Sequence, residues 1–186
     1  MQQAASVEPR ERLRLFVALL LPEDVRAHLS AWQEHELSGR SGLRVVPPTS
    51  LHVTIAFLGS RPPEDVERVA GVLRAAANGL ASPVLEPVRY RETRSVAMIV
   101  LSDQEKRANV LAERVFEGLE RLGIYERESR DWLPHVTVAR FLQRPRLAPS
   151  VPSLGAVVSS EMAVMLSRLR PGGAEYEVLE SVLLGG

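Results

Sequence analysis

The sequence predicts an α+β fold, in which antiparallel strands pair beside helices. Three observations favour it: strand and helix patterns alternate along much of the chain, the last two segments are strands joined by a short turn, and one strand pattern occurs once in each half. With 186 residues the chain can form one sizeable core or two small lobes. We expect residues 1–11 to be a disordered tail and residues 12–186 to be a single domain.

In the first half, strand and helix patterns alternate. They predict a strand at 13–19, a helix starting at Pro22, a strand at 51–58 and a helix within 62–80. Proline and acidic residues open each helix, as is usual for a first helical turn. Because side chains alternate along a strand, Ile55 and Phe57 should share one face of the strand at 51–58. His52 and Thr54 should share the other face.

In the second half, strands predominate. The predicted elements are strands at 84–91, 95–101 and 134–141, a helix after Asp103, a loop at 145–152 and a hairpin formed by 162–169 and 176–184. Asp103 should cap the helix and Gly123 should end it. The closing strand pairs favour an antiparallel sheet over a doubly wound parallel one.

The composition excludes several classes of protein. The chain has no cysteine, which rules out disulfides, thiolate metal sites and cysteine nucleophiles. Its formal net charge of zero argues against a protein that coats long nucleic acids. The apolar run Leu15 to Leu21 is too short to span a membrane and no signal-peptide cleavage site follows it, so we expect a cytoplasmic protein.

Two of the four histidines lie in nearly identical tetrapeptides. One reads His-Val-Thr-Ile from His52, and the other reads His-Val-Thr-Val from His135. On a strand, residues i and i+2 project from the same face about 7 Å apart, so each motif offers an imidazole and a hydroxyl to one surface. A single histidine on a strand is more often structural, but the repeated pair with Thr54 and Thr137 indicates a functional site.

Two imidazoles and two hydroxyls suit the opening of a cyclic phosphodiester. One imidazole can deprotonate water while the other protonates the leaving oxygen, and the hydroxyls can donate hydrogen bonds to the phosphoryl oxygens. A catalytic zinc site would need three ligands at short spacing, and a serine hydrolase would need a Gly-x-Ser-x-Gly turn; the sequence has neither pattern. No metal and no cofactor is therefore expected.

These residues resemble the two-histidine (2H) phosphoesterases, specifically the RNA 2',3'-cyclic phosphodiesterase group that is also named 2'-5' RNA ligase. The matching segments are Arg14 to Ala18, Pro48 to Gly59, Leu133 to Arg140 and the hairpin from Ser167 to Tyr176. Single His-x-Thr matches are common, but four segments in this order are specific. Alanine at position 56 departs from the lysine that the family often has before this phenylalanine, so a lysine contact to phosphate is not expected there.

The resemblance implies two pseudo-symmetric lobes, each an antiparallel sheet with outer helices, and an active-site cleft between them. It also implies hydrolysis of RNA ends or nucleotides with a 2',3'-cyclic phosphate to a 2'-phosphate, with weak RNA ligation as a side activity. Our hypothesis is that His52 protonates the leaving 3'-oxygen and His135 activates water. Thr54 and Thr137 would bind the phosphate, and the enzyme is expected to be a monomer.

Other residues have two open interpretations each. Arg140 lies an odd number of residues from Thr137, so it either reaches the phosphate from the strand end or forms a salt bridge at the rim. Phe16 and Phe141 either stack on a base or, as we favour, pack in the core. The arginines within 89–94 either steer RNA or belong to a solvated strand edge.

The function also has alternatives. The substrate could be another phosphodiester, such as a 2'-5' linkage or a cyclic ADP-ribose product. The chain could instead be a nucleotide-binding module that has the cleft without the turnover, although both intact motifs speak against this. Genuine ligation would need a second RNA held in register, for which this neutral chain has no evident binding track.

Overall fold

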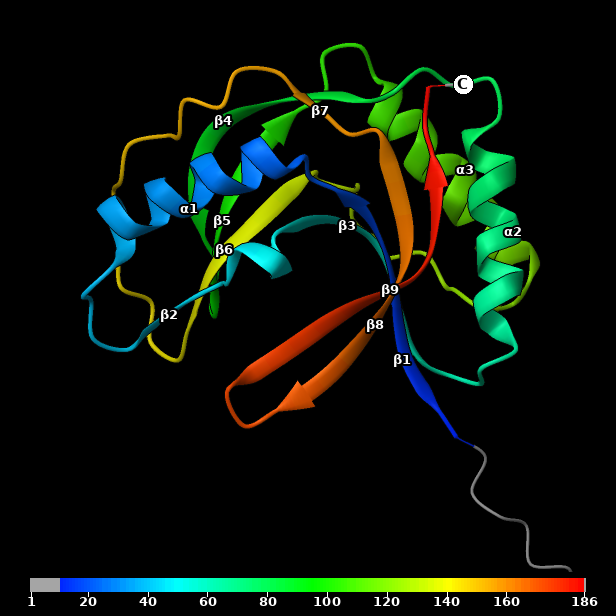
Figure 1. The fold of residues 1–186 in the computed structure, drawn as a ribbon, viewed down its shortest axis with the longest axis horizontal. Coiled ribbons are helices and arrows are strands. Elements are labelled where there is room, and N and C mark those ends of the chain that lie inside the picture. The colour runs from blue at the N-terminus through cyan, green and yellow to red at the C-terminus, as the bar shows by residue number, and fades with distance from the viewer. Residues whose placement is uncertain (1–10, 186) are drawn as a thin grey trace, which may run out of the picture.

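The computed structural model describes residues 11–185, which form a curled antiparallel sheet with helices packed on it (Figure 1). The strands are β1 (Leu13–Leu20), β2 (Leu43–Val45), β3 (His52–Arg61), β4 (Val84–Glu92), β5 (Val96–Ser102), β6 (His135–Phe141), β7 (Val157–Val158), β8 (Glu161–Arg170) and β9 (Gly173–Leu183). The helices are α1 (Glu23–Leu37), the 3-10 turn η1 (Pro48–Ser50), α2 (Asp65–Ala77) and α3 (Arg107–Arg121). Apart from Glu11, the predicted tail lies outside the described residues.

The sheet consists of two lobes that meet at its centre. The strand order is β7-β4-β5-β6-β3-β1-β8-β9, with β2 also paired to β6. At the junction of β3 and β6 the two lobes are joined through the pair Val53 and Val136. We call β2, β4, β5, β6 and β7 with α1 the β6 lobe, and β1, β3, β8 and β9 with α2 and α3 the β3 lobe. The predicted α+β fold with two lobes of antiparallel strands is confirmed.

The helices lie on the outer faces of the two lobes. Helix α2 packs on β8, β9 and α3, and α3 also contacts β3 and β4. Helix α1 lies across the β6 lobe, where the Trp32 ring meets the Tyr90 ring of β4 with 6.4 Å between centroids (Figure 1). The opposite faces of β3 and β6 are therefore left open for a site.

Strand β1 is buried on both faces. Leu15, Val17 and Leu19 belong to the main core, which also contains Val53 and Val136 from the lobe junction. The alternate residues of β1 belong to a second, smaller core, in which the Phe16 ring packs against side chains of β8. A strand covered on both faces is expected to be apolar throughout, which explains the continuous apolar pattern of this segment.

The predicted elements are confirmed, with a few differences. The short strands β2 and β7 were not predicted, because two or three residues are too few to show a period. Helix α3 begins at Arg107 with Lys106 at the N-cap position, so Asp103 lies three residues before the cap that was expected of it. Its Oδ2 still accepts a backbone N–H of the first helical turn, that of Asn109 at 2.8 Å. The proline-rich segment at 145–152 has no regular structure, as expected.

Two bulges interrupt the central strands at matching places. In the pairing of β1 with β3, Ala18 opposes Thr54 and Val17 opposes Ala56, so Ile55 is an extra residue. In the pairing of β5 with β6, Met98 opposes Thr137 and Ala97 opposes Ala139, so Val138 is extra. An extra residue reverses the facing of every side chain beyond it. The expected facing of Phe57, on the side of Ile55, is therefore wrong.

Candidate active site

The two His-x-Thr motifs come together where the lobes meet. In antiparallel strands, the residues next to the Val53–Val136 pair oppose each other, so His52 faces Thr137 and Thr54 faces His135. The valines are fully buried, while the four polar residues, which we call the quartet, are half-buried and lie on the other side of the sheet. All four line one cavity of about 500 Å³. The central prediction from the sequence, that both motifs share one surface, agrees with this geometry.

Both imidazoles have the same hydrogen bond to the backbone. Nδ1 of His52 donates to the Ser50 carbonyl at 2.8 Å, and Nδ1 of His135 donates to the Leu133 carbonyl at 2.8 Å. In each case the acceptor lies two residues before the histidine. A proton held on Nδ1 leaves Nε2 as the reactive nitrogen, and this hydrogen bond fixes the ring orientation. The chain therefore positions two equivalent imidazoles by the same local device.

The surroundings of His52 are aromatic. Its ring centroid lies 5.0 Å from that of Phe16 and 5.1 Å from that of Tyr176. Burial lowers the pKa of His52 from 6.5 to about 4; the Ser50 carbonyl opposes this change, while the charges of Arg140 and His135 add to it. His52 is thus a neutral base at pH 7 in the free protein. Its Nε2 lies 3.1 Å from Thr54 Oγ1, so the hydroxyl donates to it.

Arg140 and Phe57 lie at equivalent positions in the two motifs, three residues after Thr137 and Thr54. The bulges turn both side chains onto the face of the histidines, and both line the cavity. Arg140 therefore lies in the cavity, as the phosphate-contact interpretation requires, but it arrives from the strand face and not from the strand end. Phe57 was missed by the sequence reasoning; its ring is 61% exposed. Alignment of the two motifs would have shown that Phe57 matches Arg140.

The two phenylalanines considered for base stacking are buried. Phe16 is 1% exposed and contacts the rings of His52, Phe57 and Tyr176, and Phe141 is 6% exposed in the main core. A base cannot stack on a ring that has no free face, so the core interpretation holds for both residues. Phe16 instead forms the apolar support beneath His52.

Trp132 and the segment around it form a second cavity that continues from the first. This cavity, of about 580 Å³, shares Thr54, Phe57 and His135 with the first and extends towards α3. The Trp132 indole N–H donates to the Thr54 carbonyl at 3.0 Å, so it ties the loop before β6 to β3. The quartet thus lies in the middle of an open cleft with two directions of exit.

Neither a metal-binding cluster nor a membrane-spanning helix occurs in the described part of the chain. Among residues 11–185 no group of three or more histidine, cysteine or acidic side chains could hold a metal ion. Over the same residues, no helix combines the length and the hydropathy needed to cross a bilayer.

The sequence is similar to proteins of known family. The family described as LigT like phosphoesterase matches residues 19–86. An RNA 2',3'-cyclic phosphodiesterase of Thermus thermophilus is 33% identical over 94% of this chain and 91% of its own length. A protein of the same name from Methanothermobacter thermautotrophicus is 26% identical, covering 91% and 97%.

Solved structures have the same fold. The crystal structure of a Thermus thermophilus protein superposes with a TM-score of 0.79 at 31% identity, covering 92% of this chain and 98% of the other. The Escherichia coli protein LigT in complex with 3'-AMP gives a TM-score of 0.75 at 21% identity, covering 95% and 100%, a likeness that concerns the fold alone.

Proposed function

The chain belongs to the LigT-like phosphoesterase family, and from this premise we propose that it hydrolyses the 2',3'-cyclic phosphate of an RNA end or nucleotide to a 2'-phosphate. The observation that carries the proposal is the cross-strand quartet of His52, Thr54, His135 and Thr137 in one cavity. The names of the curated relatives supply the substrate class.

In the proposed reaction, water attacks phosphorus and the bond from phosphorus to the 3'-oxygen breaks. His135 Nε2 takes the proton of the attacking water, and His52 Nε2 gives a proton to the departing 3'-oxygen. The products are a 2'-phosphate and a free 3'-hydroxyl. Two imidazoles on opposite strands suit the in-line arrangement, because the attacking and leaving oxygens lie on opposite sides of phosphorus.

The phosphoryl oxygens need donors that do not compete for the proton. The hydroxyls of Thr54 and Thr137 supply hydrogen bonds, and the Arg140 guanidinium supplies positive charge in the same cavity. Binding would release Thr54 from its hydrogen bond to His52. The added negative charge beside His52 favours its protonated form, so its pKa should rise from about 4 when the cyclic phosphate binds.

The remaining expectations concern the setting of the reaction. RNA ends and nucleotides are the proposed partners, since one structural relative binds 3'-AMP. We propose a monomeric, metal-independent enzyme of the cytoplasm that comprises residues 12–186 as one domain. Weak 2'-5' ligation would follow the same steps, with the 5'-hydroxyl of a second RNA attacking phosphorus in place of water.

Phosphorus NMR of a nucleoside 2',3'-cyclic phosphate tests the proposal. We expect a 2'-phosphate as the product, and a loss of about 10²- to 10⁴-fold in kcat for His52→Ala and for His135→Ala. His35→Ala, which removes an exposed histidine of α1, is the matched control and should keep full activity. EDTA should have no effect.

Each other outcome points to an alternative. Inhibition by EDTA would indicate a metal site. Nucleotide binding without measurable turnover would indicate a binding module. Turnover of a 2'-5' linked dinucleotide or of a cyclic ADP-ribose product, in preference to the cyclic phosphate, would indicate a different diester as substrate.

A further inference from the structure

Two arginines of β4 lie on the same sheet face as the histidines of the quartet. Arg89 pairs with Val100, which pairs with His135 on the next strand. Arg91 pairs with Met98, which pairs with Thr137. Paired residues of antiparallel strands share a face, so each row leads from the quartet to an arginine. With strands about 4.8 Å apart, each arginine backbone lies about 10 Å from its partner on β6.

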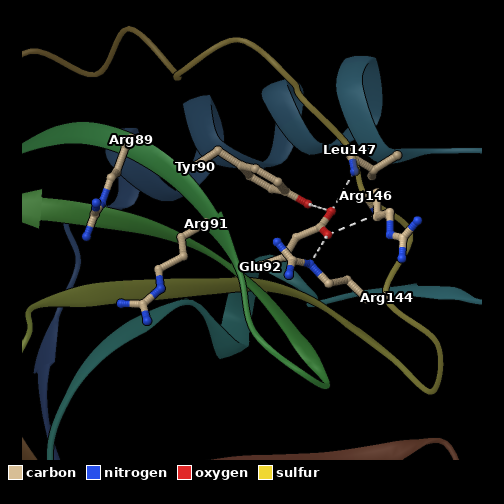
Figure 2. Close-up of a pocket in the computed structure, with 7 residues that line it drawn as sticks. All are labelled: Arg89, Tyr90, Arg91, Glu92, Arg144, Arg146 and Leu147. Carbon is tan, nitrogen blue, oxygen red and sulfur yellow. Dashed lines mark hydrogen bonds and ion pairs between the residues drawn. The ribbon is translucent and has the colours of Figure 1, made fainter.

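The side chains of Arg89 and Arg91 are exposed and form no hydrogen bond or ion pair with any residue in the described part of the chain. Figure 2 shows both side chains directed away from the Glu92 carboxylate, although all three belong to one strand. Glu92 instead accepts hydrogen bonds from Tyr90, Arg144 and the backbone N–H groups of residues 146 and 147. The Glu92 carboxylate is therefore already hydrogen-bonded to other groups, and the guanidinium groups of Arg89 and Arg91 are available to an external anion.

Two other arginines of the neighbouring cavity are already paired. Arg127 pairs with Glu113, and Arg130 pairs with Glu128, in each case with 2.6 Å between nitrogen and oxygen. Asp131, which also lines this cavity, adds a negative charge. Of the three arginines that line this cavity, Arg91 of β4 is therefore the one without an ion pair among the described residues.

The cavities connect the quartet with these arginines. Arg91 lines the cavity that contains His135 and Thr54, and it also lines a further cavity of about 650 Å³ together with Arg89 (Figure 2). Arg144 and Arg146 border the same further cavity from the loop after β6. A ligand that extends from the quartet along β4 would thus meet two free guanidiniums in succession.

We propose that Arg89 and Arg91 form a second anion-binding site, which holds the phosphodiester backbone of the RNA strand upstream of its cyclic phosphate. This rests on the proposed function, because it assigns the cyclic end to the quartet. Guanidinium groups bind phosphate oxygens with two parallel hydrogen bonds. Arg89 and Arg91 follow each other along one strand, which suits a chain of phosphodiester groups. The site predicts that an oligonucleotide is a better substrate than a mononucleotide.

Kinetics with two substrates test the site: a nucleoside 2',3'-cyclic phosphate, and a single-stranded oligonucleotide of about five nucleotides with the same cyclic end. The variant Arg89→Gln/Arg91→Gln should lower kcat/KM for the oligonucleotide about tenfold at low salt and leave the mononucleotide unchanged. The salt dependence of oligonucleotide binding should also fall, by about 1.4 in the slope of log K against log salt, for two lost contacts. Arg94→Gln, in the turn after β4, is the matched control and should change neither substrate by more than about twofold.

The outcomes separate this site from the proposed function. If wild type hydrolyses both substrates with equal kcat/KM, or if the double variant loses activity on both alike, the second site is wrong while the quartet stands. If wild type hydrolyses neither, the proposed function fails. An unchanged urea midpoint in the double variant would show that its defect is in binding, because neither guanidinium has a partner among the described residues.

Discussion

The two histidines have the same backbone hydrogen bond but different surroundings. Each donates Nδ1–H to a carbonyl two residues earlier, so the two motifs hold their imidazoles through the same backbone contact. Only His52 lies against the rings of Phe16 and Tyr176, which remove water from it. The division of labour between acid and base must therefore come from these surroundings, not from the motifs themselves.

A substrate with a better leaving group would identify the acid. In a cyclic phosphate with sulfur in place of the 3'-oxygen, the departing thiolate needs little protonation. We expect His52→Ala to lose less than about tenfold in kcat on this analogue, while His135→Ala keeps its loss of about 10²- to 10⁴-fold. Single-turnover rates of both variants on the oxygen and sulfur substrates provide the measurement. The reverse pattern would assign the acid to His135.

The lowered pKa of His52 also makes stability depend on pH. Its folded-state pKa of about 4 lies below the unfolded value of 6.5, so the unfolded chain binds more protons between these values. Stability should therefore rise with pH through this window, and the penalty below about pH 4 amounts to roughly 3 kcal/mol. His52→Gln removes this penalty. Urea unfolding at pH 4 and pH 7 should show a smaller difference for the variant, whereas equal differences would rule out a buried neutral His52.

At the residue scale, the sequence predicted the facing of His52, Thr54, His135 and Thr137 correctly. Simple alternation holds over the three residues of each motif. It failed for Phe57 and left Arg140 on the wrong face, since each follows a bulge. A bulge is defined by the partner strand, which a single segment of sequence does not contain. The contacts of His52 with the rings of Phe16 and Tyr176 were also missed, because they too depend on neighbouring strands.

At the scale of elements, the bulge in β6 is held by a buried amide of α1. Gln33 is 2% exposed, and its Nε2 donates to the carbonyls of Val46 at 3.0 Å and Val138 at 2.8 Å. Val138 is the extra residue that turns Arg140 into the cleft. The Val138 carbonyl also accepts the Val46 N–H at 3.0 Å, so the Gln33 amide and this backbone group together fix the strand irregularity on which the active-site face depends.

Gln33→Leu should lower the free energy of unfolding by about 1–3 kcal/mol, because it removes the amide donor of the Val46 carbonyl and leaves the Val138 carbonyl with the Val46 N–H alone. The activity should also fall at temperatures where the variant is fully folded, since the position of Arg140 is no longer fixed. Glu34→Leu places the same side chain at the exposed neighbouring position and should change stability by less than about 0.5 kcal/mol. Equal stability of the two variants in urea would contradict this role of Gln33.

Most elements were predictable because each has a clear period over seven residues or more. The loop after β6 was predicted as a surface segment, but the contact that fixes it to the sheet was not predicted. Glu92 fixes it by accepting the backbone N–H groups of Arg146 at 3.0 Å and Leu147 at 2.7 Å. This contact joins residues more than fifty positions apart, so no local pattern reveals it.

At the scale of the whole molecule, the chain passes between the lobes repeatedly. The β3 lobe receives β1, then β3 and α2, then α3, and finally β8 and β9, while the intervening segments build the β6 lobe. The main core contains residues of both lobes. The repeat of the His-x-Thr motif indicated two halves, but not that each lobe is assembled from distant parts of the sequence.

Neither lobe can therefore fold without most of the chain, and we expect one cooperative unfolding transition. The two tryptophans report on different lobes, because Trp32 lies in α1 and Trp132 donates to the Thr54 carbonyl of β3. In urea, the fluorescence of Trp32→Phe and of Trp132→Phe should each follow the far-UV circular dichroism of the same variant. If the fluorescence change precedes the loss of helix in only one variant, the lobe that contains the remaining tryptophan unfolds separately. The pair between β3 and β6 would then join two independent units.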